Sequence, residues 1–334
     1  TLFGDIRKLI AAGQLGAAES ALRQRISEYP TEAESWVVLG DLLADSGQLT
    51  KAEAAYRESV RLKPDLAAGW CNLGYALHRQ GKPQEAIRSF QEALRLRPDH
   101  PETLNNLGLL QAEIGDWSQA EKHLHLAIGH KPDYAAAHFN LGNVLMDQRR
   151  LPEAEQSFRS AMVFAPDFVE GHTNLGAIQA EQGRHGEAVG NYRAALSVKP
   201  GFLPALTGLA TSLNATGAHE EALEILRTAI RAHPRESGCY FDLAEILLSL
   251  MRFDAGETAL SQGLALEPQN AHARNHYCLA IYAQGRQGEA LSCFEALLKS
   301  DPDHAPALYN SARILNDLGR THEAENRLRA VLRD

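Results

Sequence analysis

The sequence is poor in the residues that mark several common classes of protein. Its 334 residues include only three methionines and four cysteines, Cys71, Cys239, Cys278 and Cys293. Because the cysteines show neither C-x-x-C spacing nor a disulfide-framework pattern, we expect them to pack as reduced side chains, with a reducing compartment as the default. No apolar run approaches the roughly 18 residues that suggest a membrane span, and no basic-then-apolar signal segment follows Thr1. Since the chain does not begin with Met, we expect a fragment of a longer protein.

Positive charge is also in short supply. Lys and Arg number 33 against 42 Asp and Glu, which gives a formal net charge of -9. A chain of this charge repels DNA, RNA and anionic lipid, so neither nucleic acid nor a membrane is an expected partner. Hydrophobic residues at 44% and charged residues at 22% are typical of an ordered globular protein. We expect a cytoplasmic location.

Motifs for catalysis are lacking as well. The sequence has neither a nucleotide-binding glycine loop nor a serine-nucleophile elbow. His272 and His276 lie four residues apart on a predicted helix, a spacing that can place two imidazoles on one metal, but no third ligand is evident. We therefore expect no catalytic residue, no metal and no other cofactor, so that any catalytic domain lies outside these residues. Metal or small-molecule chemistry at this histidine pair is the alternative of a different class.

What the sequence does contain is a repeat. Proline recurs nine times at an unbroken spacing of 34, at Pro30, Pro64, Pro98, Pro132, Pro166, Pro200, Pro234, Pro268 and Pro302. Only a repeated structural unit explains this spacing. When each proline is position 32, the copies span 1–32 (incomplete), 33–66, 67–100, 101–134, 135–168, 169–202, 203–236, 237–270, 271–304 and 305–334 (incomplete).

Each copy predicts two helices joined by a short turn. Apolar residues at positions 4, 7, 8 and 11, and again at 20, 24 and 27, follow helical spacing and give two amphipathic helices, A and B. Glycine at position 15 separates them in most copies, as expected for a residue in the left-handed conformation. Arg149 and Met251 replace it, so we expect those two turns to be strained or differently shaped. Aspartates after the proline, such as Asp65 and Asp133, are expected to cap the next helix.

The residues within the copies point to a known family. Trp36 and Trp70 stand at position 4, Leu-Gly at 7 and 8, Ala at 20 and 27, an aromatic residue at 24 and Pro at 32. This unit resembles the tetratricopeptide repeat over essentially the whole chain. The resemblance implies an all-α fold, a right-handed α-solenoid superhelix of about ten tandem helix-turn-helix repeats in a single array over 1–334. It also implies an interaction scaffold and not an enzyme.

Position 6 carries a second resemblance. The strings CNLG, NNLG, FNLG and TNLG place asparagine at intervals of 34, at Asn72, Asn106, Asn140 and Asn174. This column is similar to the asparagine ladder of O-linked N-acetylglucosamine transferases, in which the amides hold the main chain of a substrate peptide beside a following glycosyltransferase domain. A carboxamide suits this role because it can both donate to and accept from a peptide group. The resemblance implies a substrate-recruiting region of a larger glycosyltransferase-type enzyme.

The column changes outside residues 67–202. Position 6 is Val38, Gly208, Asp242 and His276 in other copies, and asparagine returns at Asn310. We expect backbone clamping to concentrate between residues 67 and 202. Two plainer alternatives stay open: the asparagines bond to the adjacent helix, or they survive from a duplicated ancestor.

The family resemblance also predicts the chemistry of the inner surface. In tetratricopeptide arrays helix A lines the concave face through positions 2, 5, 6, 9, 12 and 13. In the copies after residue 32, eleven acidic residues occupy these positions, opposed by two arginines, Arg79 and Arg313. We expect a basic or neutral partner, a protein or an extended peptide. The candidate binding residues are Asn72, Asn106, Asn140, Asn174, Asn310, Tyr75, Asn143, Asp147, Glu113 and Glu181. The alternatives are a solvated acidic face that aids solubility, and a stand-alone assembly or self-associating adaptor, including a homodimer.

Overall fold

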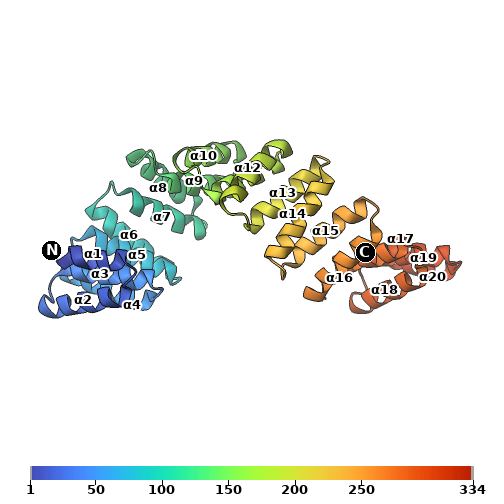
Figure 1. The fold of residues 1–334 in the computed structure, drawn as a ribbon, viewed down its shortest axis with the longest axis horizontal. Coiled ribbons are helices and arrows are strands. Elements are labelled where there is room, and N and C mark those ends of the chain that lie inside the picture. Colours follow the sequence, from blue (N-terminus) through green and yellow to red (C-terminus); the bar gives the residue numbers. More distant parts are fainter. Residues whose placement is uncertain (1, 332–334) are drawn as a thin grey trace. The chain divides into compact units, whose positions relative to one another are not determined.

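The computed structural model describes residues 2–331, which form twenty α-helices and no strand within that range. The all-α expectation is therefore confirmed. The chain divides into two compact units, 1–171 and 172–334, and the boundary falls inside α11 (Val169–Glu181). Each unit consists of helices that pack in consecutive antiparallel pairs (Figure 1). No helix among residues 2–331 is long and apolar enough to cross a membrane.

The helices of the first unit lie before α11. They are α1 (Leu2–Ala11), α2 (Leu15–Glu28), α3 (Ala33–Asp45), α4 (Leu49–Leu62), α5 (Ala67–Arg79), α6 (Pro83–Leu96), α7 (Pro101–Glu113), α8 (Trp117–His130), α9 (Ala135–Asp147) and α10 (Leu151–Phe164). Each full pair begins at the residue that the proline spacing predicts as the first of a copy. The helices thus follow the 34-residue spacing of the prolines.

The second unit continues the same alternation after α11. Its helices are α12 (His185–Val198), α13 (Leu203–Ala215), α14 (His219–Ala232), α15 (Ser237–Ser249), α16 (Phe253–Leu266), α17 (Ala271–Ala283), α18 (Gln287–Ser300), α19 (Ala305–Asp317) and α20 (Thr321–Val331). Odd-numbered helices correspond to helix A of the repeat and even-numbered helices to helix B.

Close packing inside five of the pairs, from α3–α4 to α11–α12, depends on a glycine that faces a large side chain. A Cβ added to Gly40 would lie 2.4 Å from Cε1 of Tyr56, and one added to Gly74 would lie 2.7 Å from the Phe90 ring. Phe90 is fully buried. Burial of such a side chain stabilises a fold by about 1.5–3 kcal/mol, so the glycine column at position 8 provides the space that the column at position 24 needs.

The turns at position 15 share one backbone conformation. Eight glycines there have φ between 71° and 84°, and Arg149 and Met251 have φ of 62° and 59°. Left-handed backbone costs a non-glycine residue roughly 1–2 kcal/mol. Of the two outcomes we expected, these turns are therefore strained and are not differently shaped.

The helix caps differ from the sequence prediction. The N-cap of α5 is Leu66 and that of α9 is Tyr134, and neither forms a side-chain cap bond. Asp65 and Asp133 precede the cap by one residue, so the prediction that they cap helix A is wrong. Asn270 does cap α17, because its side chain accepts from the Ala273 amide at 2.9 Å.

The cysteines also require a correction. Cys278 on α17 and Cys293 on α18 form a disulfide with a Cα–Cα distance of 5.6 Å, whereas we expected none. The two cysteines stand at positions 8 and 23 of one repeat, where helices A and B lie in close contact. Cys71 and Cys239 are buried and free, as expected for packing residues. Because disulfides persist mainly in oxidising compartments, the bond argues against the reducing default.

Candidate functional site

Four of the predicted binding residues line one cavity between α7 and α9. Its volume is about 260 Å³, and its lining residues are Leu109, Ala112, Glu113, Trp117, Asn140, Asn143, Val144 and Asp147. Glu113, Asn140, Asn143 and Asp147 reach it from positions 13, 6, 9 and 13 of two successive A helices. The columns assigned to the inner face therefore do meet at one site in this pair of repeats. We call it the α7–α9 cavity.

A buried amide fixes the orientation of Asn140. The Asn140 Nδ2 donates to Oδ1 of Asn105 at 2.9 Å, and Asn105 Nδ2 donates to Oδ1 of Asn106 at 3.4 Å. Asn105 is only 5% exposed, whereas Asn140 is half-buried. An asparagine amide has two N–H donors and a carbonyl acceptor, so this bond uses one donor and leaves a donor–acceptor pair outside it.

The same kind of bond recurs at two other asparagines of the column. Asn310 Nδ2 donates to Asn275 Oδ1 at 3.1 Å, and Asn72 Nδ2 donates to Asp41 Oδ1 at 2.7 Å. In each case the acceptor lies on helix A of the preceding repeat. The alternative that these asparagines bond to the adjacent helix thus holds for three members, and it is compatible with ligand binding through the rest of the amide.

Asp41 is a structural carboxylate and not a groove charge. Its Oδ1 accepts from the Tyr56 hydroxyl at 2.8 Å as well as from Asn72. Burial raises the pKa of Asp41, while the bonds from Tyr56 and Asn72 act in the opposite direction. Burial, followed by the charge of Asp41, raises the pKa of Tyr56 above its usual range. This cluster ties helices of successive repeats together.

Several other acidic side chains of the inner columns have cationic partners. Glu34 pairs with Lys63 at 2.7 Å and Glu102 with Lys131 at 3.4 Å. The hydrogen bond from Lys63 is the largest cause that lowers the pKa of Glu34. Both lysines stand at position 31, at the end of helix B, which lies outside the columns read for charge. The ratio of eleven acids to two bases therefore overstates the negative charge that faces a partner.

The remaining candidate residues lie outside the α7–α9 cavity. Tyr75 on α5 is 40% exposed, and its hydroxyl accepts from Arg79 Nη1 at 2.9 Å. Asn72 is also on α5, and Asn106 is on α7. Asn174 and Glu181 belong to α11, and Asn310 to α19 in the second unit. Glu113 has a further contact, since its carboxylate lies 2.6 Å from Nε2 of His78 on α5.

The histidine pair is adjacent but has no metal-binding surroundings. The ring centroids of His272 and His276 lie 4.5 Å apart. Within the part of the chain that the structure describes, no group of three or more His, Cys, Asp or Glu side chains could hold a metal ion. The two imidazoles line a different cavity, between α15 and α17.

Sequence reasoning missed two contributors to the α7–α9 cavity environment. Trp117, at the start of helix B, lines the cavity and is 37% exposed, although position 17 is outside the inner columns. Asn105 positions Asn140 from below the surface. A signal for Asn105 was present, because NNLG is the one string of the column with two consecutive asparagines.

Comparisons with protein families cover nearly the whole chain. Residues 7–174, about half of the chain, match the family described as the C-terminal domain of cilia and flagella-associated protein 70. Residues 179–237, 213–275 and 282–334 match the family described as the tetratricopeptide repeat. In Arabidopsis thaliana, Protein NPGR2 is 33% identical over 85 residues, which is 25% of this chain and 11% of that protein. The chain thus spans a small part of this relative.

Solved structures show the same fold at low sequence identity. The structure of pilF from Pseudomonas aeruginosa aligns with a TM-score of 0.58 and 16% identity, and covers 65% of this chain and 97% of pilF. A tetratricopeptide repeat protein from Parabacteroides merdae aligns with a TM-score of 0.53 and 19% identity, over 75% of this chain and 98% of that protein. Both likenesses concern the fold alone.

Proposed function

Because the chain belongs to the tetratricopeptide repeat family, whose members are generally non-catalytic protein-interaction scaffolds, we propose that its A helices hold an extended segment of a partner protein. The α7–α9 cavity is the centre of the proposed site in the first unit. Asn140 and Asn143 would bind the main chain of the segment, and Glu113 and Asp147 would attract its basic side chains. The glycosyltransferase connection is a narrower form of this proposal.

The observation that carries the proposal is the bond between Asn140 and Asn105. It holds the Asn140 amide in one orientation at the wall of a cavity, so that little side-chain entropy is lost when a peptide binds. The second N–H and the carbonyl oxygen can then pair with the C=O and N–H of one peptide unit. Such pairing recognises backbone and is therefore tolerant of the partner's sequence.

The magnitudes require several contacts at once. A neutral hydrogen bond contributes about 0.5–1.5 kcal/mol net, so one amide is too weak to hold a peptide. Trp117 and Leu109 add apolar surface to the same cavity, and partly exposed aromatic side chains often contribute most of the binding energy at such sites. We expect that the amides fix the direction and register of the segment, and that the apolar contacts supply affinity.

Panning of a random peptide phage library on the purified chain tests the proposal. The selected peptides would be titrated calorimetrically against the wild type and against the double variant Asn140→Ala/Asn143→Ala. Loss of these two side-chain amides is expected to weaken peptide binding by about ten-fold. The matched control is Asn326→Ala, an exposed asparagine on helix B, α20, which should leave the affinity unchanged. Equal affinity for all three proteins would remove these amides from the site.

The narrower role and the alternative each have their own test. The column of Asn72, Asn106, Asn140 and Asn174 motivates a recruiting role for an attached transferase. If this role is correct, deletion of the array from a protein that also contains the transferase domain should change which proteins the enzyme modifies. Self-association, the alternative inferred from sequence, predicts a molar mass that rises with concentration in light scattering.

A further inference from the structure

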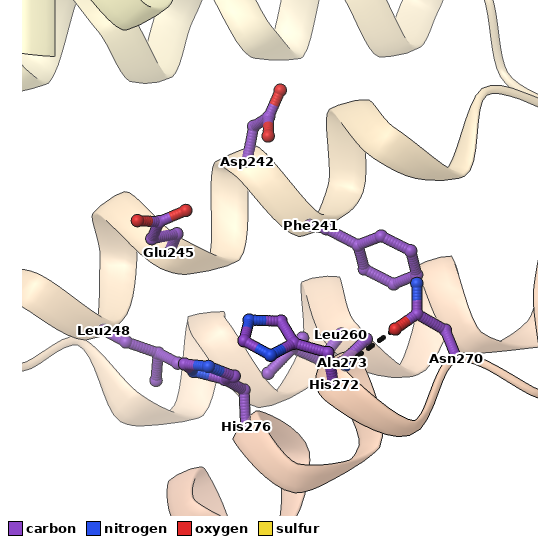
Figure 2. Close-up of a pocket in the computed structure, with 9 residues that line it drawn as sticks. All are labelled: Phe241, Asp242, Glu245, Leu248, Leu260, Asn270, His272, Ala273 and His276. Carbon is purple, nitrogen blue, oxygen red and sulfur yellow. Dashed lines mark hydrogen bonds between the residues drawn. The ribbon is translucent and has the colours of Figure 1, made fainter.

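A second cavity lies between α15 and α17 in the second unit, where the asparagine column is interrupted. Its volume is about 460 Å³, and helix A positions supply most of its lining. Asp242 and Glu245 come from α15, and His272 and His276 come from α17 (Figure 2). Figure 2 shows His272 and His276 side by side on one helix, with Asp242 and Glu245 on the neighbouring helix and the Asp242 carboxylate directed away from the imidazoles.

The apolar wall of this cavity depends on another glycine. Phe241 lies against Gly263 of α16, where an added Cβ would be 2.4 Å from Cε1 of the ring. Most other copies have alanine at this position of helix B. Because Gly263 lets the ring lie close to α16, Phe241 lines the cavity together with Leu248 and Leu260. The cavity thus combines an aromatic wall with two carboxylates.

The combination selects a cation with an aliphatic stem. Carboxylates at positions i and i+3 of one helix lie side by side, so Asp242 and Glu245 reinforce each other's negative charge. Burial, followed by the charge of Glu245, raises the pKa of Asp242, which is the direction expected where negative charge lacks compensation. Lys and Arg carry apolar stems that pack on an aromatic ring, and their charged ends pair with carboxylates.

We propose that the α15–α17 cavity binds the ammonium or guanidinium group of a Lys or Arg side chain from an extended partner segment, and releases it as His276 takes up a proton. The inference rests on the proposed function, because it assumes a partner that lies along the A helices. The α15–α17 cavity would recognise a basic side chain of the partner, whereas the asparagines would recognise only its main chain.

The acid sensitivity follows from the groups around the cavity. On α15 the titratable groups are Asp242 and Glu245, and on α17 they are His272 and His276. α16 contributes only Leu260 to the lining, and α13 (Leu203–Ala215) has no titratable side chain. α19 meets this part of α17 through the bond from Asn310 to Asn275.

Protonation of His276 therefore reduces the negative charge of the cavity. Burial, followed by the charge of His272, lowers the pKa of His276, so His276 is neutral at about pH 7.5 and takes up its proton only below the usual value of about 6.5. Asp242 loses charge in the same direction, because its pKa is raised. Both changes weaken the attraction for a cation as the pH falls.

The test uses a capped Gly-Ser peptide of about nine residues with one central Arg, long enough to cross the cavity at about 30 Å when extended. Ring resonances of His272 and His276 in the full chain would be followed by NMR. At about pH 7.5 we expect saturable shifts with the Arg peptide, and none with the matched peptide that has neutral citrulline. As the pH is lowered stepwise below about 6.5, we expect the affinity for the Arg peptide to fall. Equal binding of the citrulline peptide, or tighter binding in acid, overturns the proposal.

Variants separate this cavity from the rest of the molecule. Exposed Glu245→Gln should weaken the Arg peptide by about ten-fold without a change in melting temperature, and Gly263→Ala, which displaces Phe241, should weaken it independently of charge. Glu325→Gln, which removes an exposed carboxylate on α20 outside both cavities, should have no effect. The Asn140→Ala/Asn143→Ala variant should keep the shifts of the His272 and His276 ring resonances on addition of the Arg peptide. The two proposals can therefore be contradicted separately: one by loss of the Arg response, the other by unchanged backbone binding in this variant. Full Arg binding by Glu245→Gln would refute the role of the carboxylates.

Discussion

The ring of Tyr192 occupies the space that a side chain at Gly208 would need. A Cβ added to Gly208 would lie 2.4 Å from Cζ and 2.7 Å from the hydroxyl oxygen of Tyr192. Gly208 stands at position 6, where the four preceding copies have asparagine. Tyr56 stands at the same repeat position as Tyr192, and its hydroxyl donates to Asp41. In the copy that contains Tyr192, the residue equivalent to Asp41 is Ala177, which has no side-chain acceptor. The asparagine column is therefore interrupted here for a steric reason.

Restoring the asparagine should consequently fail. We expect Gly208→Asn to lower the free energy of unfolding by about 1–3 kcal/mol, because the new side chain overpacks against Tyr192. Urea denaturation followed by circular dichroism would measure the loss. Gly190→Asn is the matched control, since an added Cβ at Gly190 has nothing within 4 Å. The double variant Gly208→Asn/Tyr192→Leu should recover part of the lost stability. If it recovers none, the Tyr192 ring is not the cause of the loss.

A left-handed methionine offers a site for stabilisation. Met251 has φ of 59° and is 75% exposed, so its side chain contributes little packing. Met251→Gly should raise the free energy of unfolding by about 1 kcal/mol, because glycine adopts this conformation without steric cost. Met251→Ala keeps the strain and should show no comparable gain. The two variants and the wild type would be compared by differential scanning calorimetry, and an equal gain in both would contradict the backbone explanation.

The disulfide should stabilise the repeat that contains it. Cys278 and Cys293 are separated by 15 residues, and closure of a loop of about this length is worth about 3 kcal/mol in the chain-entropy model. Reduction with a phosphine should therefore lower the melting temperature of the wild type. The variant Cys278→Ala/Cys293→Ala should melt at the same temperature with and without the reductant. The bond would be contradicted if reduction left the wild-type melting temperature unchanged. It would also be contradicted if the unfolded chain, without reductant, had four reactive thiols.

The free thiol at Cys239 should respond to pH in an unusual way. Burial, with a smaller contribution from Asp242, raises the pKa of Cys239 to about 11. The neutral thiol is therefore favoured in the folded state, and only about one molecule in a thousand has a thiolate there at pH 8. Alkylation by iodoacetamide, followed by peptide mass spectrometry, should accelerate steadily between about pH 7 and 10. A plateau near pH 9, the behaviour of an ordinary thiol, would exclude the raised pKa.

Sequence alone was sufficient for the fold because the repeat constrains every copy in the same way. Proline at position 32 ends helix B, and the starts of α3, α5 and α7 coincide with the predicted copy boundaries. Features that depend on one copy were harder to predict. Position 8 is usually the glycine that faces helix B, and this column could have identified Cys278 as a residue close to helix B and thus to Cys293.

The candidate binding residues remain a prediction, but part of their geometry follows from the repeat. Asn140, Asn143, Glu113 and Asp147 line one cavity, because equivalent positions of stacked A helices share a face. The charge of that face was overestimated, since Lys63 and Lys131, which pair with Glu34 and Glu102, stand at position 31, outside the columns assigned to the inner face. Contacts between different columns are set by packing, which periodicity does not describe.

The Cys278–Cys293 bond joins the two helices of a single repeat, and this location matters when the chain is pulled from its ends. Each ordinary repeat can lengthen through its whole contour, whereas the 15-residue interval between the cysteines cannot open. At about 3.3–3.6 Å per residue, the linked repeat would release about 50 Å less extension than its neighbours. The bond therefore limits how far one repeat can be mechanically unravelled without stiffening its junctions with the next.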